Sequence, residues 1–203
     1  AGTQARLIAK HYNLFYLDTG KIYRFIGYEK IKNKKNFNYS FIKKKVKNLD
    51  IKKLKNKNLL SNIVATEASI VARDIKIRKI VHNFQKKCAY KPPKKFRGSI
   101  LDGRDITSVI VKDANFKFFI TANVKTRAFR RFKELKSLKR KISYKDVLKS
   151  IKKRDKSDYH RRYSPLKKTK DSILINTSNL TKRACFLKIK SIIDKKLKLN
   201  GNL

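Results

Sequence analysis

Four short apolar runs, each ending in a polar turn, constrain the fold of this chain more than any other feature. The runs span residues 14–17, 99–102, 116–121 and 172–176. A short run that is apolar on both faces is typical of a strand in a sheet covered on both sides, so each run is predicted to be a buried strand. Helical patterns separate the runs, and this alternation predicts an α/β fold with a parallel sheet. In such sheets ligands bind beyond the carboxyl ends of the strands.

The spacing of apolar residues predicts where the helices lie. They are expected over residues 1–12, 22–28, 59–89, 124–135, 144–153 and 181–197. The longest of these is expected to break in two near Asp74 and to end before Pro92 and Pro93, which a helix does not continue through. Residues 29–58 are rich in lysine and asparagine, and we expect them to form a peripheral insert with little core of its own.

The charge balance points to anionic partners. The chain has 56 lysines and arginines against 14 aspartates and glutamates, a net charge of +42. Such an excess excludes an acidic calcium buffer and suits nucleotides, nucleic acid or a membrane surface. The excess runs from Lys10 to Lys198 rather than forming a tail, so a background bias towards lysine and asparagine fits it equally well. No stretch approaches the roughly 20 apolar residues of a membrane span, so we expect a soluble protein without a membrane partner.

Cysteine and histidine are too few and too scattered to predict a metal or disulfide framework. The two cysteines are Cys88 and Cys185, without a CxxC pair, and the three histidines have no spaced partners. We expect ordinary core or surface roles for all five and a reducing, cytoplasmic location. Methionine is absent even at position 1, so the chain is expected to begin inside a longer protein.

The sharpest local motif is Asp102-Gly103-Arg104-Asp105, directly after a predicted strand. Gly103 allows a sharp turn, Arg104 offers a planar fork for a phosphate, and Asp105 offers acceptors to an amino or hydroxyl group. An ordinary turn with a local ion pair would also explain the motif. A second motif, Asp18-Thr19-Gly20-Lys21-Ile22-Tyr23-Arg24, follows another strand and provides a hydroxyl, a ring and a guanidinium for a nucleotide. Its alternative interpretation is a helix cap followed by one core and one solvent-facing residue.

A third motif lies in the basic segment 152–162. If this segment is helical, Arg154, Asp158 and Arg161 are spaced i, i+4, i+7 and share one face. Two guanidiniums beside a carboxylate on a mobile segment would close over a phosphorylated substrate and exclude water. A solvated helix face with weak intrahelical ion pairs is the competing interpretation.

Taken in order, these motifs resemble those of bacterial cytidylate kinases, which are nucleoside monophosphate kinases of the P-loop superfamily. Asp102-Gly103-Arg104-Asp105 is identical to the family's D-G-R-D. The other matching segments are Gly2-Thr3 before a helix, residues 17–24, Ala68-Ser69 with Arg78, Asp113-Ala114 before 116–121, the arginine-rich 127–132, and Arg154-Asp155, Asp158 and Arg161 before Pro165-Leu166. The resemblance implies a three-layer P-loop kinase domain over residues 1–203, with a monophosphate-binding insert at about 29–68 and a helical lid at about 150–166.

The resemblance also implies an activity and a set of roles. The activity is transfer of the γ-phosphoryl group of ATP to CMP or dCMP with Mg²⁺, in a monomer with no nucleic acid as primary partner. Ser69, Arg78 and Asp105 would read the cytosine, Asp158 would contact the ribose, and Tyr23 would line the pocket. The monophosphate and the transferring group would be held by Thr19, Arg24, Arg104, Arg154 and Arg161, of which Arg104, Arg154 and Arg161 are the catalytic residues. Gly2 and Thr3 would belong to the ATP site, with Thr3 as the Mg²⁺ ligand or its neighbour.

The sequence departs from the family pattern at its start and in the insert. Ala1 stands where the lysine of the phosphate-binding loop is expected, and the strand before it lies outside the sequence, so this chain is expected to bind CMP better than it turns over ATP. Without that strand its neighbours in the sheet would be unpaired. Residues 29–58 are shorter and more basic than the expected insert. Two other classes stay open: a basic nucleic-acid-binding protein, and a P-loop relative that has lost catalysis.

Overall fold

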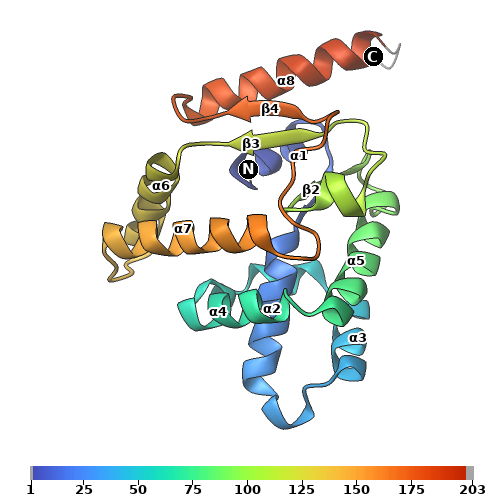
Figure 1. Cartoon of the computed structure of the whole chain (residues 1–203). Helices are drawn as coiled ribbons and strands as arrows, with labels where there is room; N and C mark the ends of the chain where they lie inside the picture. The colour runs from blue at the N-terminus through green and yellow to red at the C-terminus, as the bar shows by residue number, and fades with distance from the viewer. Residues whose placement is uncertain (1, 200–203) are drawn as a thin grey trace.

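The computed structural model describes residues 2–199 as an α/β protein that is mostly helical (Figure 1). In chain order the elements are α1 (Gly2–His11), β1 (Phe15–Asp18), α2 (Thr19–Lys32), α3 (Tyr39–Lys47), α4 (Asn62–Val71), α5 (Ile75–Tyr90), β2 (Ser99–Asp102), β3 (Phe118–Thr121), α6 (Val124–Ser137), α7 (Tyr144–His160), β4 (Ile173–Asn176) and α8 (Lys182–Leu199). Short 3₁₀ turns lie at Lys34–Asn36, Ile51–Lys55 and Lys57–Leu60, and a π turn at Ile106–Ile110. None of the described helices is both long and apolar enough to cross a membrane.

The strands pair in parallel, as the alternating pattern predicts. β1 pairs with β2 and β3 with β4, so residues 2–199 contain two two-stranded sheets. The register of the first pair places Asp18 beside Asp102, at the carboxyl ends of both strands. The prediction that the fourth strand is covered on both faces is wrong, because Leu174 is 53% exposed while Ile175 is buried.

The largest core joins β1 to helices α2, α3, α4 and α5. Leu17 and Ile22 are fully buried in it, and so are side chains from the lysine-rich segment, among them Ile42, Val46 and Leu54. The expectation of a peripheral insert with little core is therefore wrong. Its aliphatic residues recur at helical spacing, so α3 buries an apolar stripe while its lysines face solvent.

The predicted break between two helices is confirmed at Asp74. α4 ends at Val71, and the Asp74 side chain caps α5 by accepting a hydrogen bond from the Ile77 amide at 3.0 Å. α2 and α4 cross very closely at Gly27, where a Cβ atom would lie 2.8 Å from the backbone nitrogen of Ala68. Glycine is therefore required at this crossing.

Helix α7 runs across the middle of the molecule, between the β3–β4 pair and the helices α2 and α4 (Figure 1). It extends to His160, well past the predicted end at residue 153, so Arg154 and Asp158 both lie on it. Ser143 caps its start by accepting from the Asp146 amide. A separate cluster of Ala128, Leu135 and Val147 packs α7 against α6.

A second hydrophobic core packs α1, β4 and α8 together. Ile8 of α1, Ile175 of β4 and Ile189 of α8 are buried together. Cys185 belongs to this core, whereas Cys88 lies half-buried beside the first one, and both are free thiols.

Candidate functional site

The turn that follows β2 carries Asp105, which is the central residue of the candidate site. A side chain at Gly103 would collide with the Thr19 hydroxyl, so only glycine lets this turn pack against the start of α2. The π turn Ile106–Ile110 follows, and the amides of Val109 and Ile110 donate to the Asp105 carbonyl. Turns of this kind are frequent at functional sites.

Arg78 of α5 forms a buried ion pair with Asp105 through its Nη2. The two residues are 3% and 5% exposed. The Nη1 of Arg78 donates to the Ala72 carbonyl at 3.0 Å, and its guanidinium lies 5.5 Å from the centre of the Tyr23 ring. Burial by itself would raise the pKa of the Asp105 carboxyl, but the contact with His82 and the charges of Arg78 and Arg161 hold that pKa below its ordinary value. Asp105 is thereby kept ionised.

Four buried polar atoms around this pair have no hydrogen-bond partner within residues 2–199. They are the Tyr23 hydroxyl, the Nε of Arg78, the Nη2 of Arg161 and the Nε2 of His82. Burial raises the pKa of Tyr23 to about 12, and the charge of Arg161 acts on both Tyr23 and Asp105. Each unpaired buried group costs about 1–3 kcal/mol. A set of such groups around one carboxylate is typical of a site that pairs them with a polar ligand.

Asp158 of α7 gathers three arginines. Its Oδ2 accepts from the Nε of Arg104 at 2.8 Å and lies 3.7 Å from the Nε of Arg154, and its Oδ1 lies 3.5 Å from the Nη1 of Arg161. Arg154 and Asp158 share a face of α7 as predicted, whereas Arg161 directly follows the end of the helix and still meets Asp158. Arg104 joins them from the turn after β2. One carboxylate cannot balance three guanidiniums, so the cluster carries an excess of positive charge.

The pKa values reflect this crowding. Burial would lower the pKa of Arg104, but the Asp158 carboxylate more than offsets it and raises that pKa. Burial and the charge of Arg104 lower the pKa of Arg154, and burial and the charge of Arg78 lower that of Arg161. A bound anion would relieve the repulsion among these guanidiniums.

Arg24 of α2 belongs to the same positive region. Its Nη1 donates to the Leu59 carbonyl at 2.7 Å. Burial, followed by the charges of Arg154 and Arg131, lowers the pKa of Arg24 to about 10. The motif after β1 and the motif on α7 therefore lie close enough for their charges to interact, although about 130 residues separate them.

The ends of β1 and β2 place two carboxylates side by side. Burial and the neighbouring Asp18 raise the pKa of Asp102. The Thr19 hydroxyl is buried and donates to the Asp102 carbonyl at 2.8 Å. A Cβ atom on Gly2 would lie 2.8 Å from the Oδ2 of Asp102, so the start of α1 approaches this carboxylate closely. Neighbouring carboxylate oxygens are the hard ligands that a divalent cation such as Mg²⁺ takes. Residues 2–199 hold no cluster of three or more His, Cys, Asp or Glu side chains placed for a metal, so these two carboxylates would need further ligands, such as phosphate oxygens, to hold the ion.

Two of the predicted site residues stand apart from these clusters. Ser69 of α4 is exposed, and its hydroxyl donates back to the Ala65 carbonyl at 3.1 Å. Thr3 of α1 is exposed, and none of the hydrogen bonds described for residues 2–199 involves its hydroxyl. Their roles stay predictions.

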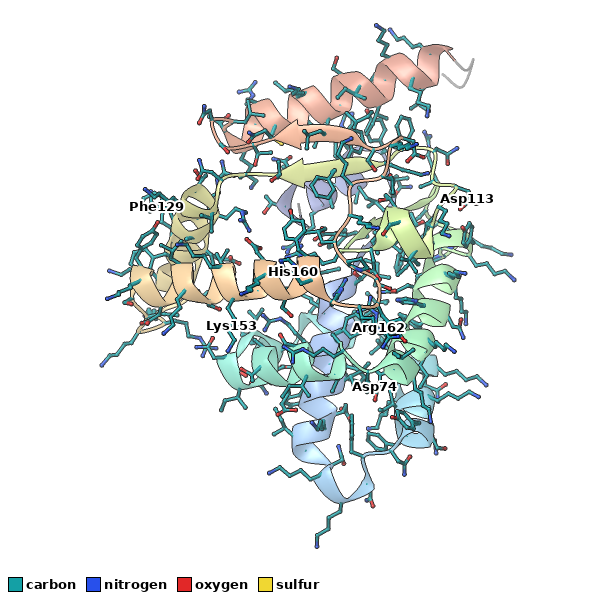
Figure 2. All side chains as sticks on the ribbon, viewed as in Figure 1. Asp74, Asp113, Phe129, Lys153, His160 and Arg162 are labelled. Carbon is teal, nitrogen blue, oxygen red and sulfur yellow. The ribbon has the colours of Figure 1, made fainter. Side chains whose placement is uncertain are left out.

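A cavity of about 560 Å³ lies beside the Asp105 cluster, and Lys153, His160 and Arg162 of its lining are labelled in Figure 2. It shares Arg161 with the cluster and is lined by Ala72, whose carbonyl binds Arg78. The rest of the cavity lining is mostly basic. It consists of Arg73, next to Ala72, and of residues from α7 and the segment that follows it: Lys153, Lys156, Ser157, His160, Arg162 and Tyr163. This mouth would attract an anionic ligand.

Two contacts at the site were not predicted from the sequence. His82 lies one turn after Arg78 on α5, and its Nε2 lies 3.4 Å from the Oδ2 of Asp105. The i, i+4 spacing from Arg78 was the available signal. Asp155 receives two hydrogen bonds from Arg127, at 2.9 and 2.6 Å, and so ties α7 to α6.

The fold and the site together define an α/β protein whose parallel strands end in an arginine and carboxylate cluster suited to a phosphorylated ligand. Comparison with known proteins specifies the family. The family model for cytidylate kinase matches residues 1–195. A cytidylate kinase from Clostridium botulinum (strain Loch Maree / Type A3) is 37% identical over 203 residues, covering 94% of this chain and 91% of the relative. A cytidylate kinase from Bartonella tribocorum is 38% identical, covering 98% of this chain and 91% of the relative. A cytidylate kinase from Mesorhizobium japonicum is 36% identical, covering 95% of this chain and 88% of the relative.

The chain therefore belongs to the cytidylate kinase family. This membership confirms the P-loop kinase fold and places the chain among nucleotide-binding phosphotransferases.

Proposed function

We propose that this protein transfers the γ-phosphoryl group of ATP to CMP or dCMP, giving CDP or dCDP. The observation that carries the proposal is the convergence of Arg24, Arg104, Arg154 and Arg161 on one region beside a buried Arg78–Asp105 pair. The relatives named above are cytidylate kinases, which supports CMP as the acceptor.

The Asp105 cluster is proposed to read the base. An ionised carboxylate accepts a hydrogen bond from the exocyclic amino group of cytosine, and the unpaired Nε of Arg78 is a donor for the ring. Tyr23 would line the pocket through its ring, and Ser69 would join on α4 once the base is bound. Burial of these groups excludes water, so each hydrogen bond counts for more than at the surface.

The arginines are proposed to hold the phosphates. Arg104 is held by Asp158 through Nε, and among the described residues 2–199 no hydrogen bond uses its two Nη groups, which would bind phosphate oxygens. Arg24 and Thr19 would bind the monophosphate from α2. Arg154 and Arg161 lie on or directly after α7, within the proposed lid at about 150–166, and would reach the transferring group when this segment closes. The proposed monophosphate-binding insert covers about 29–68. Asp158, now shared among three arginines, would contact the ribose.

Mg²⁺ and ATP are the proposed co-reactants. Asp18 and Asp102 supply the carboxylates that fit the ion, and Thr3 and Gly2 lie at the start of α1, where the ATP phosphates would be bound. When bound, Mg²⁺ neutralises phosphate charge during transfer. The protein's own part is to position the two phosphates and stabilise the developing charge with guanidiniums, since phosphoryl transfer rests mainly on these two effects.

The test is a coupled assay of ADP formation by the protein with ATP and Mg²⁺. ADP is expected to form when CMP or dCMP is added, and UMP is expected to be a weaker acceptor because its carbonyl meets the Asp105 carboxylate. Absence of CMP-dependent ADP formation would contradict the proposal.

A further inference from the structure

His82 is the contact of Asp105 that the proposed function does not use. Its side chain is 18% exposed, and its Nε2 lies 3.4 Å from the Oδ2 of Asp105. Nε2 is buried and forms no hydrogen bond of standard geometry within residues 2–199, and the acceptor that it faces is the Asp105 carboxylate. With a hydrogen on Nε2, His82 can donate to this carboxylate, whereas a bare ring nitrogen would repel it.

Arg78 and His82 both approach the same oxygen. The Nη2 of Arg78 and the Nε2 of His82 each face Oδ2, while none of the hydrogen bonds and ion pairs within residues 2–199 uses Oδ1. Residues 78 and 82 lie on one face of α5, so the helix presents two donors from neighbouring turns. Arg78 holds the carboxylate at Oδ2, the Nε2 of His82 approaches the same oxygen, and Oδ1 is left for a ligand.

We propose that His82 is a positioning residue that orients the Asp105 carboxylate and thereby sets the preference for cytosine over uracil. The inference rests on the proposed function, in which Asp105 reads the base. Cytosine presents an amino donor where uracil presents a carbonyl acceptor. A fixed, ionised carboxylate accepts from the amino group and repels the carbonyl oxygen. Without the His82 donor the carboxylate can turn away and is less firmly ionised, so both effects weaken.

The experiment compares the affinities of CMP and UMP by isothermal titration calorimetry. His82→Phe keeps an aromatic ring of similar shape but removes both nitrogens, and His82→Gln retains an N–H donor. Asn83→Leu is the matched control, because Asn83 is the exposed neighbour on α5. His82→Phe is expected to lose about tenfold in CMP affinity, as for one lost charge-assisted hydrogen bond, while UMP affinity changes little. His82→Gln is expected to recover most of the loss, and Asn83→Leu to match the wild type.

Each other outcome has a distinct meaning. If His82→Phe weakens CMP and UMP equally, His82 only packs against the site and the inference is overturned. If His82→Gln is as weak as His82→Phe, the donor role is overturned. Should His82→Phe fail to fold, as judged by circular dichroism, His82→Leu takes its place with the same criteria. If the wild type binds no CMP, the proposed function itself fails, whereas wild-type binding with an unchanged CMP to UMP ratio in His82→Phe removes only the role of His82.

Discussion

Arg78 shows at the scale of one residue how this chain keeps a charge in its interior. The guanidinium is buried, and Asp105, the Ala72 carbonyl and the face of Tyr23 together stabilise it. Its Nε still has no partner among the described residues. A buried ion pair contributes little net stability, but removing one partner leaves a buried charge uncompensated. We propose that the arrangement is kept because the pair binds the nucleotide base.

Asp105→Asn tests the pair through the pH dependence of stability. The folded-state pKa of Asp105 lies below its ordinary value of 3.8, so its stabilisation is present above that value and is lost as the pH falls through the folded pKa. At neutral pH we expect the variant to be less stable by about 3 kcal/mol. In urea unfolding series the difference between wild type and variant should shrink as the pH falls below about 4. A difference that stays constant from neutral pH into this acid range would contradict the assignment.

Arg104→Ala tests the phosphate site. Asp158 uses the Nε of Arg104, and no hydrogen bond within residues 2–199 uses its Nη groups, which are proposed to bind phosphate. CMP affinity is expected to fall at least tenfold, about 1.4 kcal/mol for a charge-assisted contact. Calorimetric titration measures it, with Lys79→Ala, an exposed position on α5, as the control. Near-normal affinity in Arg104→Ala would remove this arginine from the site.

At the scale of helices and strands, much of the fold can be predicted from the sequence. The spacing of apolar residues and the turns at the ends of strands are local signals. The strands at 99–102 and 173–176 and the break at Asp74 follow from them directly. The prediction that the lysine-rich segment has little core is wrong because the burial of Ile42 and Val46 depends on helices that are distant in the sequence. The many lysines around these two residues obscure their helical spacing. The arginine motifs were visible, but His82 was not, because its partner Asp105 is 23 residues away and only the fold brings them together.

Gly27→Ala tests the crossing of α2 and α4, which carry Arg24 and Ser69. A Cβ at position 27 would meet the Ala68 backbone nitrogen at 2.8 Å, so the helices must separate. We expect a loss of about 1–3 kcal/mol in the free energy of unfolding, as for an overpacked core. Gly20→Ala, in the first turn of the same helix, has only a 3.4 Å contact to an Asp18 oxygen and is expected to be nearly neutral. Equal stability of the two variants in chemical denaturation would show that the close approach does not constrain the crossing.

At the scale of the whole molecule, the charge of +42 surrounds a site that is itself positive. The cavity beside Asp105 adds Arg73, Lys153, Lys156 and Arg162 to the arginines of the cluster. The general excess of charge and the specific site contribute differently to nucleotide affinity. Salt screens exposed charges, whereas it screens buried contacts much less. Both are proposed to act on the phosphate of the nucleotide rather than on its base.

Salt separates these two contributions. CMP affinity is expected to fall several-fold between about 0.05 and 0.5 M salt, because the Debye length shortens across this range. Cytidine, which has the same base without a phosphate, is expected to bind more weakly and with little salt dependence. Equal salt dependence for CMP and cytidine, measured by calorimetry, would show that the positive region does not bind the phosphate.

A crystal structure of the protein with CMP is the most direct test of the convergence described here. The base should lie against Asp105 and Arg78, with its amino group within hydrogen-bond distance of the Asp105 carboxylate, and the phosphate should lie among Arg24, Arg104 and Arg161. CMP bound on another face, or these side chains turned away from it, would contradict the assignment of the site.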